Sequence, residues 1–297
     1  MNNYVNSDLA VESKGIFGLK DRKNASYSEE EEEHSTICRL SIEDKETSAY
    51  YGRDIGHYVT VFCDKLWLMD GDAIEGVAAT VSRELRAMLE RCCEGKDVRD
   101  ISVLIAGLGN SEITADAIGP LTVSGMTVTR HLESYYKKIF GDRKVTRVSA
   151  VIPGVLSQTG IETLEIVRSA ARSVKPDAVV AIDALAARNC ERLGATIQLS
   201  DNGISPGSGI GNMRKAINRE NLGVPVIALG VPTVAHSSTL VYDALEKAGI
   251  DKPTPELTEV LENGKGFFVS PKESDVITRS VSELLSLSLD ITFGTRL

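Results

Sequence analysis

The sequence predicts an α/β fold with three layers, in which helices cover both faces of a mostly parallel central sheet. Two continuous runs of small and branched apolar residues, 101–106 and 178–182, are typical of strands that are buried on both faces. Around these runs, strand and helix patterns alternate, which predicts parallel βαβ units with right-handed crossovers. At 297 residues, the chain is long enough to bury a sizeable core.

The part of the chain before residue 101 combines a polar region with a predicted strand and a predicted helix. The first fifty residues are polar, and the run Glu29–Glu33 within them predicts a solvated loop. Residues 58–62 are β-branched and aromatic, so they predict a strand. From Ala73 to Cys93, apolar residues recur at steps of three and four, which predicts an amphipathic helix that ends at Gly95.

The central part carries the alternation. The expected elements are a strand at 101–106, a helix from 115 to 135, a strand at 145–151, a helix at 161–174, a strand at 178–183, a short strand at 196–199, a helix at 213–218 and a strand at 224–229. Thr159 is placed to cap the helix at 161–174, and Pro176 to end it. A closing helix is expected from 273 to 289.

Each of the two buried runs leads to an aspartate, Asp116 after the first and Asp183 after the second. Open α/β sheets carry their chemistry beyond the carboxyl ends of their strands, so both carboxyls are expected at one sheet edge. Two carboxyls that share a site cannot both ionise easily, and one then serves as acid while the other serves as base. Such a pair can activate water against a peptide carbonyl. Taken singly, Asp116 also fits a helix N-terminus and Asp183 a hydrogen-bonded strand end.

A glycine turn follows the first buried strand. Gly107, Gly109 and Asn110 begin like a nucleotide-binding turn, but Glu112 stands where the third glycine belongs and no P-loop lysine follows. No cofactor is therefore expected. We expect this turn to border a substrate groove, where the glycines allow close backbone approach and Asn110 supplies amide hydrogen bonds.

A second loop, residues 203–212, is rich in glycine and serine. It resembles a nucleophile turn only superficially, because it lacks the Gly-x-Ser-x-Gly pattern at a strand end and has no histidine in an obvious partner position. We expect Ser208 and Asn212 to border the same substrate groove.

Composition excludes several classes of protein. The five cysteines fall in no metal-ligand spacing and predict reduced thiols, and no metal site is expected. The net charge of −9 argues against direct nucleic-acid binding and suits a basic or neutral partner. No stretch approaches the roughly 20 apolar residues of a membrane span, and the start lacks the features of a signal peptide. We therefore expect a cytoplasmic protein without membrane contact.

Several motifs occur in a fixed order between roughly residues 100 and 240. They are Gly107–Asn110 with Thr114–Pro120, Pro153–Val155 with Gln158–Gly160, Ala181–Arg188, Gly203–Gly209 and Gly230–Thr233, with weaker counterparts at Ser7–Glu12 and Phe267–Glu273. Together they resemble the germination protease family of spore-forming bacteria.

This resemblance implies a fold similar to that of the hydrogenase-maturation endopeptidases. It implies an endopeptidase that degrades small acid-soluble spore proteins during germination, with Asp116 and Asp183 as catalytic residues. It also implies a homotetramer in the spore core or forespore. Family members are zymogens that process themselves, and the matching bond here joins Asp8 to Leu9. Residues 1–8 would then be a propeptide, and residues 9–297 a single peptidase domain with a polar elaboration around 20–50.

Two other functions remain open from the sequence. One is a metal-dependent endopeptidase of the hydrogenase-maturation type, in which a histidine would join the two acids, and His236 is the candidate ligand. The resemblance implies an acidic residue at that position, so the chain departs from the family there, and we expect a surface or supporting histidine. The other is a binding module that holds a small ligand at the turn Gly107–Asn110 without chemistry.

Overall fold

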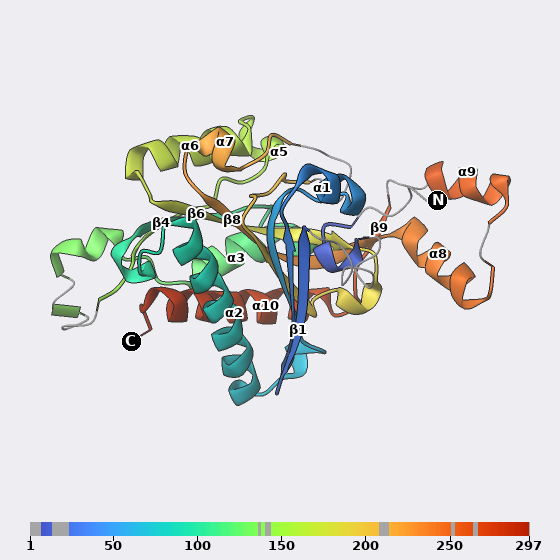
Figure 1. The fold of residues 1–297 in the computed structure, drawn as a ribbon, viewed down its shortest axis with the longest axis horizontal. Coiled ribbons are helices and arrows are strands. Elements are labelled where there is room, and N and C mark those ends of the chain that lie inside the picture. The colour runs from blue at the N-terminus through green and yellow to red at the C-terminus, as the bar shows by residue number, and fades with distance from the viewer. Residues whose placement is uncertain are drawn as a thin grey trace.

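A large mixed sheet lies at the centre of the molecule (Figure 1). The computed structural model describes residues 7–13, 24–135, 138–139, 144–207, 214–250, 253–263 and 267–296. Within these residues, nine strands pair in the order β1-β2-β3-β7-β8-β6-β4-β5, and β9 pairs with β8. The strands are β1 (Ala25–Glu32), β2 (Ser35–Ile42), β3 (Gly56–Phe62), β4 (Ser102–Gly107), β5 (Arg147–Val151), β6 (Ala178–Ala187), β7 (Thr196–Ser200), β8 (Val226–His236) and β9 (Phe268–Val269).

The prediction of an α/β fold is confirmed, but the prediction of a mostly parallel sheet is wrong. Only the neighbours β5, β4, β6 and β8 run parallel, and the other described pairs are antiparallel. Residues 188–195, which join β6 to β7, are too few to form a crossover with a helix, since a parallel return needs about a dozen residues or more. β7 therefore returns in the opposite direction, and the hairpin of β1 and β2 extends the sheet through β3.

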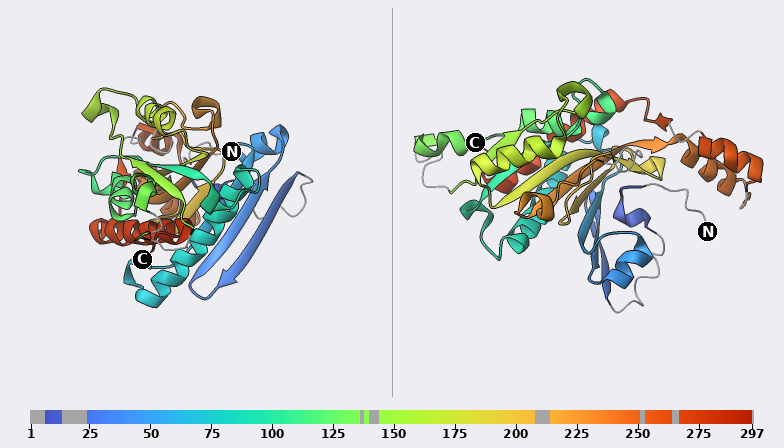
Figure 2. Two further views of the ribbon diagram at one scale, coloured as in Figure 1. Left: turned by 90° about the vertical axis from the view of Figure 1, so that its left-hand side faces the viewer. Right: turned by 90° about the horizontal axis from the view of Figure 1, so that it is seen from above.

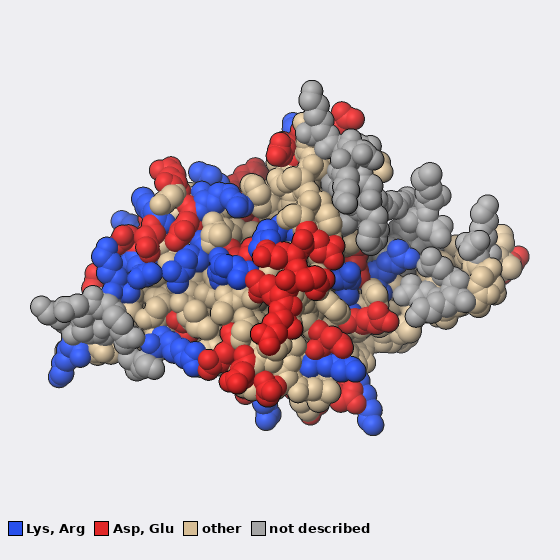
Figure 3. All heavy atoms as spheres, turned by 60° about the horizontal axis from the view of Figure 1, so that its bottom comes forward, with Lys and Arg blue, Asp and Glu red and all other residues tan. Residues whose placement is uncertain are grey.

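Residues Glu29–Glu32 of the glutamate run form the second half of strand β1 instead of a loop, and Glu33 lies in the turn that follows. β1 pairs with β2 along its whole length, with Glu30 opposite Ile37 and Glu32 opposite Ser35. The charges remain largely exposed and are partly neutralised, because Arg39 of β2 bonds to Glu30 and to Glu84. Figure 3 shows an acidic patch at the centre of the surface that faces the viewer. The strand forms because its partner supplies the ladder of hydrogen bonds, which composition does not reveal.

Helices cover both faces of the sheet (Figures 1 and 2). The α-helices are α1 (Lys45–Tyr51), α2 (Gly71–Cys92), α3 (Ile118–Gly125), α5 (Leu156–Thr159), α6 (Thr163–Val174), α7 (Arg219–Leu222), α8 (Ser237–Lys247), α9 (Pro255–Asn263) and α10 (Ser274–Phe293). α2, α3 and α10 lie on one face, and α5, α6 and α7 on the other. Across the described part of the chain, we find no helix with the length and apolar character needed to cross a membrane.

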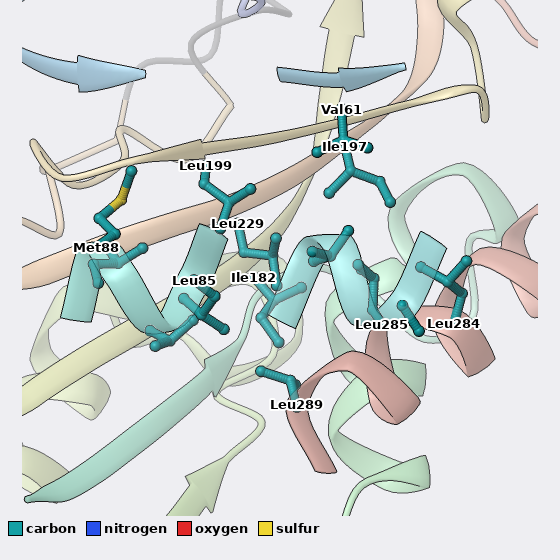
Figure 4. Close-up of a cluster of buried hydrophobic side chains, with 14 of the residues drawn as sticks. Val61, Leu85, Met88, Ile182, Ile197, Leu199, Leu229, Leu284, Leu285 and Leu289 are labelled. Carbon is teal, nitrogen blue, oxygen red and sulfur yellow. The ribbon is translucent and has the colours of Figure 1, made fainter. Parts of the chain in front are cut away.

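The larger core lies between the sheet, α2 and α10 (Figure 4). Ile182 of β6 points into it, toward Leu85 of α2 and Leu289 of α10, and each such buried side chain contributes about 1.5–3 kcal/mol. The alternate residue of β6, Ala181, belongs to the smaller core beneath α6. Because side chains alternate along a strand, Asp183 projects on the same face as Ala181.

Three of the expected helices differ from the structure, two in their boundaries and one because it does not form. The helix expected from 115 to 135 ends at Gly125, and Asp290 of α10 accepts a hydrogen bond from the Thr127 N–H and holds the chain extended there. Thr159 ends the short α5, and α6 begins after Glu162. No helix forms over residues 214–218, whereas Met213 lies outside the described residues. The expected strands and the helices expected at 73–93 and 273–289 are present.

Candidate active site

Asp183 lies near the middle of β6 with 5% of its surface exposed. One carboxylate oxygen accepts a hydrogen bond of 3.0 Å from the backbone N–H of Ala184. Burial raises the pKa of Asp183 well above its ordinary value, and the negative charges of Asp116 and Asp8 raise it further. The protonated form of this carboxyl is therefore favoured, as a general acid requires.

Asp116 approaches from the loop that follows β4, in the short 3-10 helix Thr114–Asp116. Its carboxylate accepts a hydrogen bond of 2.9 Å from the backbone N–H of Asn110. Burial raises the pKa of Asp116 to about 6, although this hydrogen bond opposes the shift. At neutral pH the carboxylate form predominates, so Asp116 is suited to act as a base.

Both carboxyls line one cavity of about 910 Å³. The cavity opens on the α6 face of the sheet, beyond the part that α6 and α7 cover, and its wall includes Asp8, Arg53 and Gln198. The two aspartates that the sequence singles out are thus brought to one place, and their electrostatic coupling has the form of an acid–base pair.

Gly107 and Gly109 allow close backbone packing in and beside the loop that carries Asp116. A Cβ atom on Gly109, whose φ is +109°, would lie 2.1 Å from the carbonyl oxygen of Asp116, and one on Gly107 would lie 2.4 Å from the carbonyl oxygen of Gly119. The side chain of Asn110 accepts hydrogen bonds from the Glu112 N–H and from the Gln158 amide. None of Gly107, Gly109 and Asn110 is among the residues that line the cavity. Their contacts hold the loop and position Asp116.

The second loop reaches the cavity through its first part. Gly203, Ile204, Ser205 and Gly207 line the wall. Ser208 and Asn212, which the sequence analysis assigns to the groove, lie outside the described residues.

The N-terminal segment 7–13 is held inside the molecule and is not a loose terminus. Leu9 and Ala10 are fully buried, and Leu9 packs in an apolar cluster with Leu185 and Leu193. The Asp8 N–H donates to the carbonyl of Ala186 on β6, and the Asp8 carboxylate accepts from the Ala186 N–H, both at 2.9 Å. The bond between Asp8 and Leu9 therefore lies at the wall of the cavity that contains both aspartates.

Glu12 anchors the other end of this segment. Its carboxylate accepts hydrogen bonds from the backbone N–H groups of Arg188 (2.7 Å) and Asn189 (2.8 Å), and it lies 3.5 Å from the guanidinium of Arg192. Its side chain is 6% exposed, so these charge-assisted bonds are shielded from water.

Arg53 and Gln198 are site residues that the sequence analysis missed. Arg53 follows α1 in the polar N-terminal region, and it contacts the segment across 44 to 46 positions of sequence. Gln198, on β7, contacts Asp8 across 190 positions. A glutamine inside an apolar strand was the one available signal, because a buried amide needs hydrogen-bond partners.

His236 lies at the end of β8 and is buried, with its ring centre 4.6 Å from that of Phe268. Of the two expected alternatives, a surface histidine is therefore wrong, because β9 pairs with the end of β8, and a supporting histidine stays a prediction. Where side chains are described, no three His, Cys, Asp or Glu residues gather as a group that could hold a metal ion.

Comparison with known proteins identifies similar sequences. A family model described as germination protease matches residues 7–248. A germination protease of Caldanaerobacter subterraneus is 38% identical over 97% of this chain and 93% of its own length. One of Clostridium perfringens is 39% identical over 97% of this chain and 94% of its own, and one of Bacillus subtilis is 40% identical over 83% and 67%.

Proposed function

The chain belongs to the germination protease family and is a peptidase, and we propose that Asp116 and Asp183 are its catalytic acid–base pair. The observation that carries this proposal is that two carboxyls with raised pKa values, one of them buried, line a single cavity. Perturbed carboxyls in a cavity are typical of functional sites.

In the proposed reaction, Asp116 takes a proton from a water molecule while the water oxygen bonds to the carbonyl carbon of the substrate. The carbon–nitrogen bond then breaks as Asp183 gives its proton to the leaving nitrogen. A proton passing from Asp116 to Asp183 restores the starting state. Acid–base catalysis of this kind contributes about 10²–10⁴-fold to a rate.

The proposed substrates are small acid-soluble spore proteins, degraded during germination. The family assignment supports this proposal, and the net charge of −9 suits a basic or neutral protein partner. We further propose a homotetramer in the cytoplasm of the spore core or forespore, and a fold related to the hydrogenase-maturation endopeptidases.

We also propose that the chain is a zymogen that cuts itself between Asp8 and Leu9, so that residues 1–8 are a propeptide and residues 9–297 are one peptidase domain. The position of Asp8 supports this proposal, because Asp8 lines the same cavity as Asp116 and Asp183.

Replacing either aspartate by asparagine tests the proposed pair, because asparagine keeps the volume but cannot exchange a proton. Asp116→Asn and Asp183→Asn should each slow cleavage of a purified small acid-soluble spore protein by about 10²-fold or more. The exposed Asp72 of α2 offers a matched control, Asp72→Asn, which should cleave at the wild-type rate. Full activity in either site variant would remove that residue from the mechanism.

The same cleavage assay distinguishes the carboxylate pair from the metal-dependent alternative. Incubation with EDTA should leave the rate unchanged if two carboxylates suffice. Loss of activity that returns on addition of a divalent cation would favour the metallo-endopeptidase instead.

A further inference from the structure

The carbonyl oxygen of Asp8 belongs to the bond that the proposed self-processing reaction breaks. It accepts two hydrogen bonds from side chains, one of 2.9 Å from Nε2 of Gln198 and one of 3.2 Å from Nη1 of Arg53. Both residues line the same cavity as Asp116 and Asp183. Two donors on one carbonyl oxygen form the arrangement that stabilises negative charge as that oxygen becomes an oxyanion.

The sheet fixes the position of Gln198 relative to Asp183. Gln198 of β7 is in register with Gly230 of β8, and Gly230 is in register with Asp183 of β6. The three residues form one row across the sheet, so Gln198 and Asp183 project from the same face, about 10 Å apart at two strand spacings. Gly230 between them has no side chain, and Leu185 occupies the space that a Cβ there would need.

Gln198 also binds the backbone of Ala10, the residue that follows Leu9. Its Oε1 accepts a hydrogen bond from the backbone N–H of Ala10, while its Nε2 donates to Asp8. One amide side chain, 8% exposed, thus holds the backbone on both sides of Leu9. The atoms of the segment that Gln198 contacts are backbone atoms, so any peptide in this position can form the same two hydrogen bonds.

Arg53 directs its guanidinium toward the same peptide. Its donors reach the carbonyl oxygens of Ser7, Asp8 and Leu9 and the hydroxyl of Ser13, at 2.6–3.2 Å. Among the described residues, no carboxylate is hydrogen-bonded to it. A half-buried cation is costly unless its charge is compensated, and here the guanidinium donates to main-chain carbonyls and is stabilised by the nearby charges of Asp8, Glu12 and Asp54.

We propose that Gln198 and Arg53 are the oxyanion donors for cleavage of the bond between Asp8 and Leu9. The inference rests on the proposed function, since it assigns donors for that reaction. When water adds to the carbonyl carbon and Asp116 takes the water proton, the electron pair of the C=O bond moves to oxygen. Gln198 and Arg53 stabilise that charge until the pair returns and the bond to the Leu9 nitrogen breaks.

The test uses full-length Gln198→Met and Arg53→Met chains, which lose the donors; methionine matches glutamine in length and keeps part of the aliphatic stem of arginine. Self-processing is followed by intact mass, and processed enzyme is assayed on a peptide with the sequence of residues 3–13. Each variant should lose about 10²–10³-fold in processing rate and in kcat for the peptide. Arg53→Lys, which keeps the charge but loses the fork of donors, should retain an intermediate rate.

Two matched controls should stay within about threefold of the wild-type rate, well below the loss expected for an oxyanion donor. Arg86→Met removes an arginine that also donates to two main-chain carbonyls, those of Ile291 and Thr292. Thr196→Val alters a buried polar residue two positions earlier on β7. If Gln198 and Arg53 only hold the segment, KM rises and saturating peptide restores kcat, which overturns the inference. If the wild-type chain cleaves neither itself nor the peptide, the proposed function fails and the inference fails with it.

Discussion

At the scale of single residues, the environments of Asp116 and Asp183 affect the pKa values of these two identical side chains differently. Asp183 is almost fully buried and receives one backbone hydrogen bond, so burial dominates its pKa. Asp116 is half-buried, and the Asn110 N–H stabilises its carboxylate, which limits the rise to a pKa of about 6. The deeper burial of Asp183 and the nearby negative charge of Asp116 favour its protonated form.

The raised pKa of Asp183 also predicts a stability cost. Its folded-state pKa exceeds the unfolded value, so the folded chain binds more protons than the unfolded chain above about pH 4. Stability associated with this group is present at low pH and is lost as pH rises toward the folded-state pKa. Asp183→Asn removes this loss, and its melting temperature should exceed that of the wild type at neutral pH.

Thermal unfolding of both proteins at pH 4 and pH 7 measures this effect. The difference in melting temperature should be larger at pH 7 than at pH 4. A variant that melts below the wild type by the same amount at both pH values would show that the carboxyl is not destabilising in the fold.

At the scale of elements, the loop between β4 and α3 determines where Asp116 lies. Gly109→Ala should move this loop, because the new Cβ would meet the Asp116 carbonyl oxygen and the φ of +109° is unfavourable for alanine. We expect at least a tenfold loss of proteolytic activity, since misplacement of a catalytic group by about 1 Å can cost 10²-fold.

Gly223→Ala provides the comparison for this loop. Gly223 has a φ of +78°, but a Cβ there would meet no atom within 4 Å, so this variant carries backbone strain without a clash. It should melt at a lower temperature and keep its specific activity. Equal activity of the two variants would show that the close contact at Gly109 does not position Asp116.

The elements that could be predicted from sequence are those that local pattern determines. The apolar runs of β4 and β6 and the periodic stripe of α2 need no knowledge of distant partners. The expectation that Asp183 ends its strand is wrong, because β6 stays paired with β8 as far as Ala187. β1 could not be predicted in this way, because its glutamates form a strand only when paired with β2. The direction of β7 likewise depends on the short connection that precedes it.

At the scale of the whole molecule, segment 7–13 joins parts of the chain that are far apart in sequence. Arg53 follows α1, Gln198 belongs to β7, and the backbone of Arg188 follows β6, yet all three bind this one segment. Such convergence depends on the complete fold, so the sequence predicts the two proposed catalytic carboxyls but not the donors around the peptide. The family resemblance suggests cleavage after Asp8, but it does not indicate that Leu9 and Ala10 are buried.

The central proposal is that the Asp116–Asp183 pair cuts the bond between Asp8 and Leu9. The pair requires Asp116 as carboxylate and Asp183 as acid. The rate should therefore fall as pH drops below about 6, where Asp116 gains a proton, and fall again as pH rises through the higher pKa of Asp183.

The most direct measurement is the intact mass of freshly purified full-length chain after incubation across this pH range. The account predicts a new N-terminus at Leu9, formed fastest between these two limits and absent in Asp183→Asn. A wild-type chain that stays full length at every pH while it cleaves spore proteins, or an Asp183→Asn chain that shortens at the wild-type rate, would contradict it.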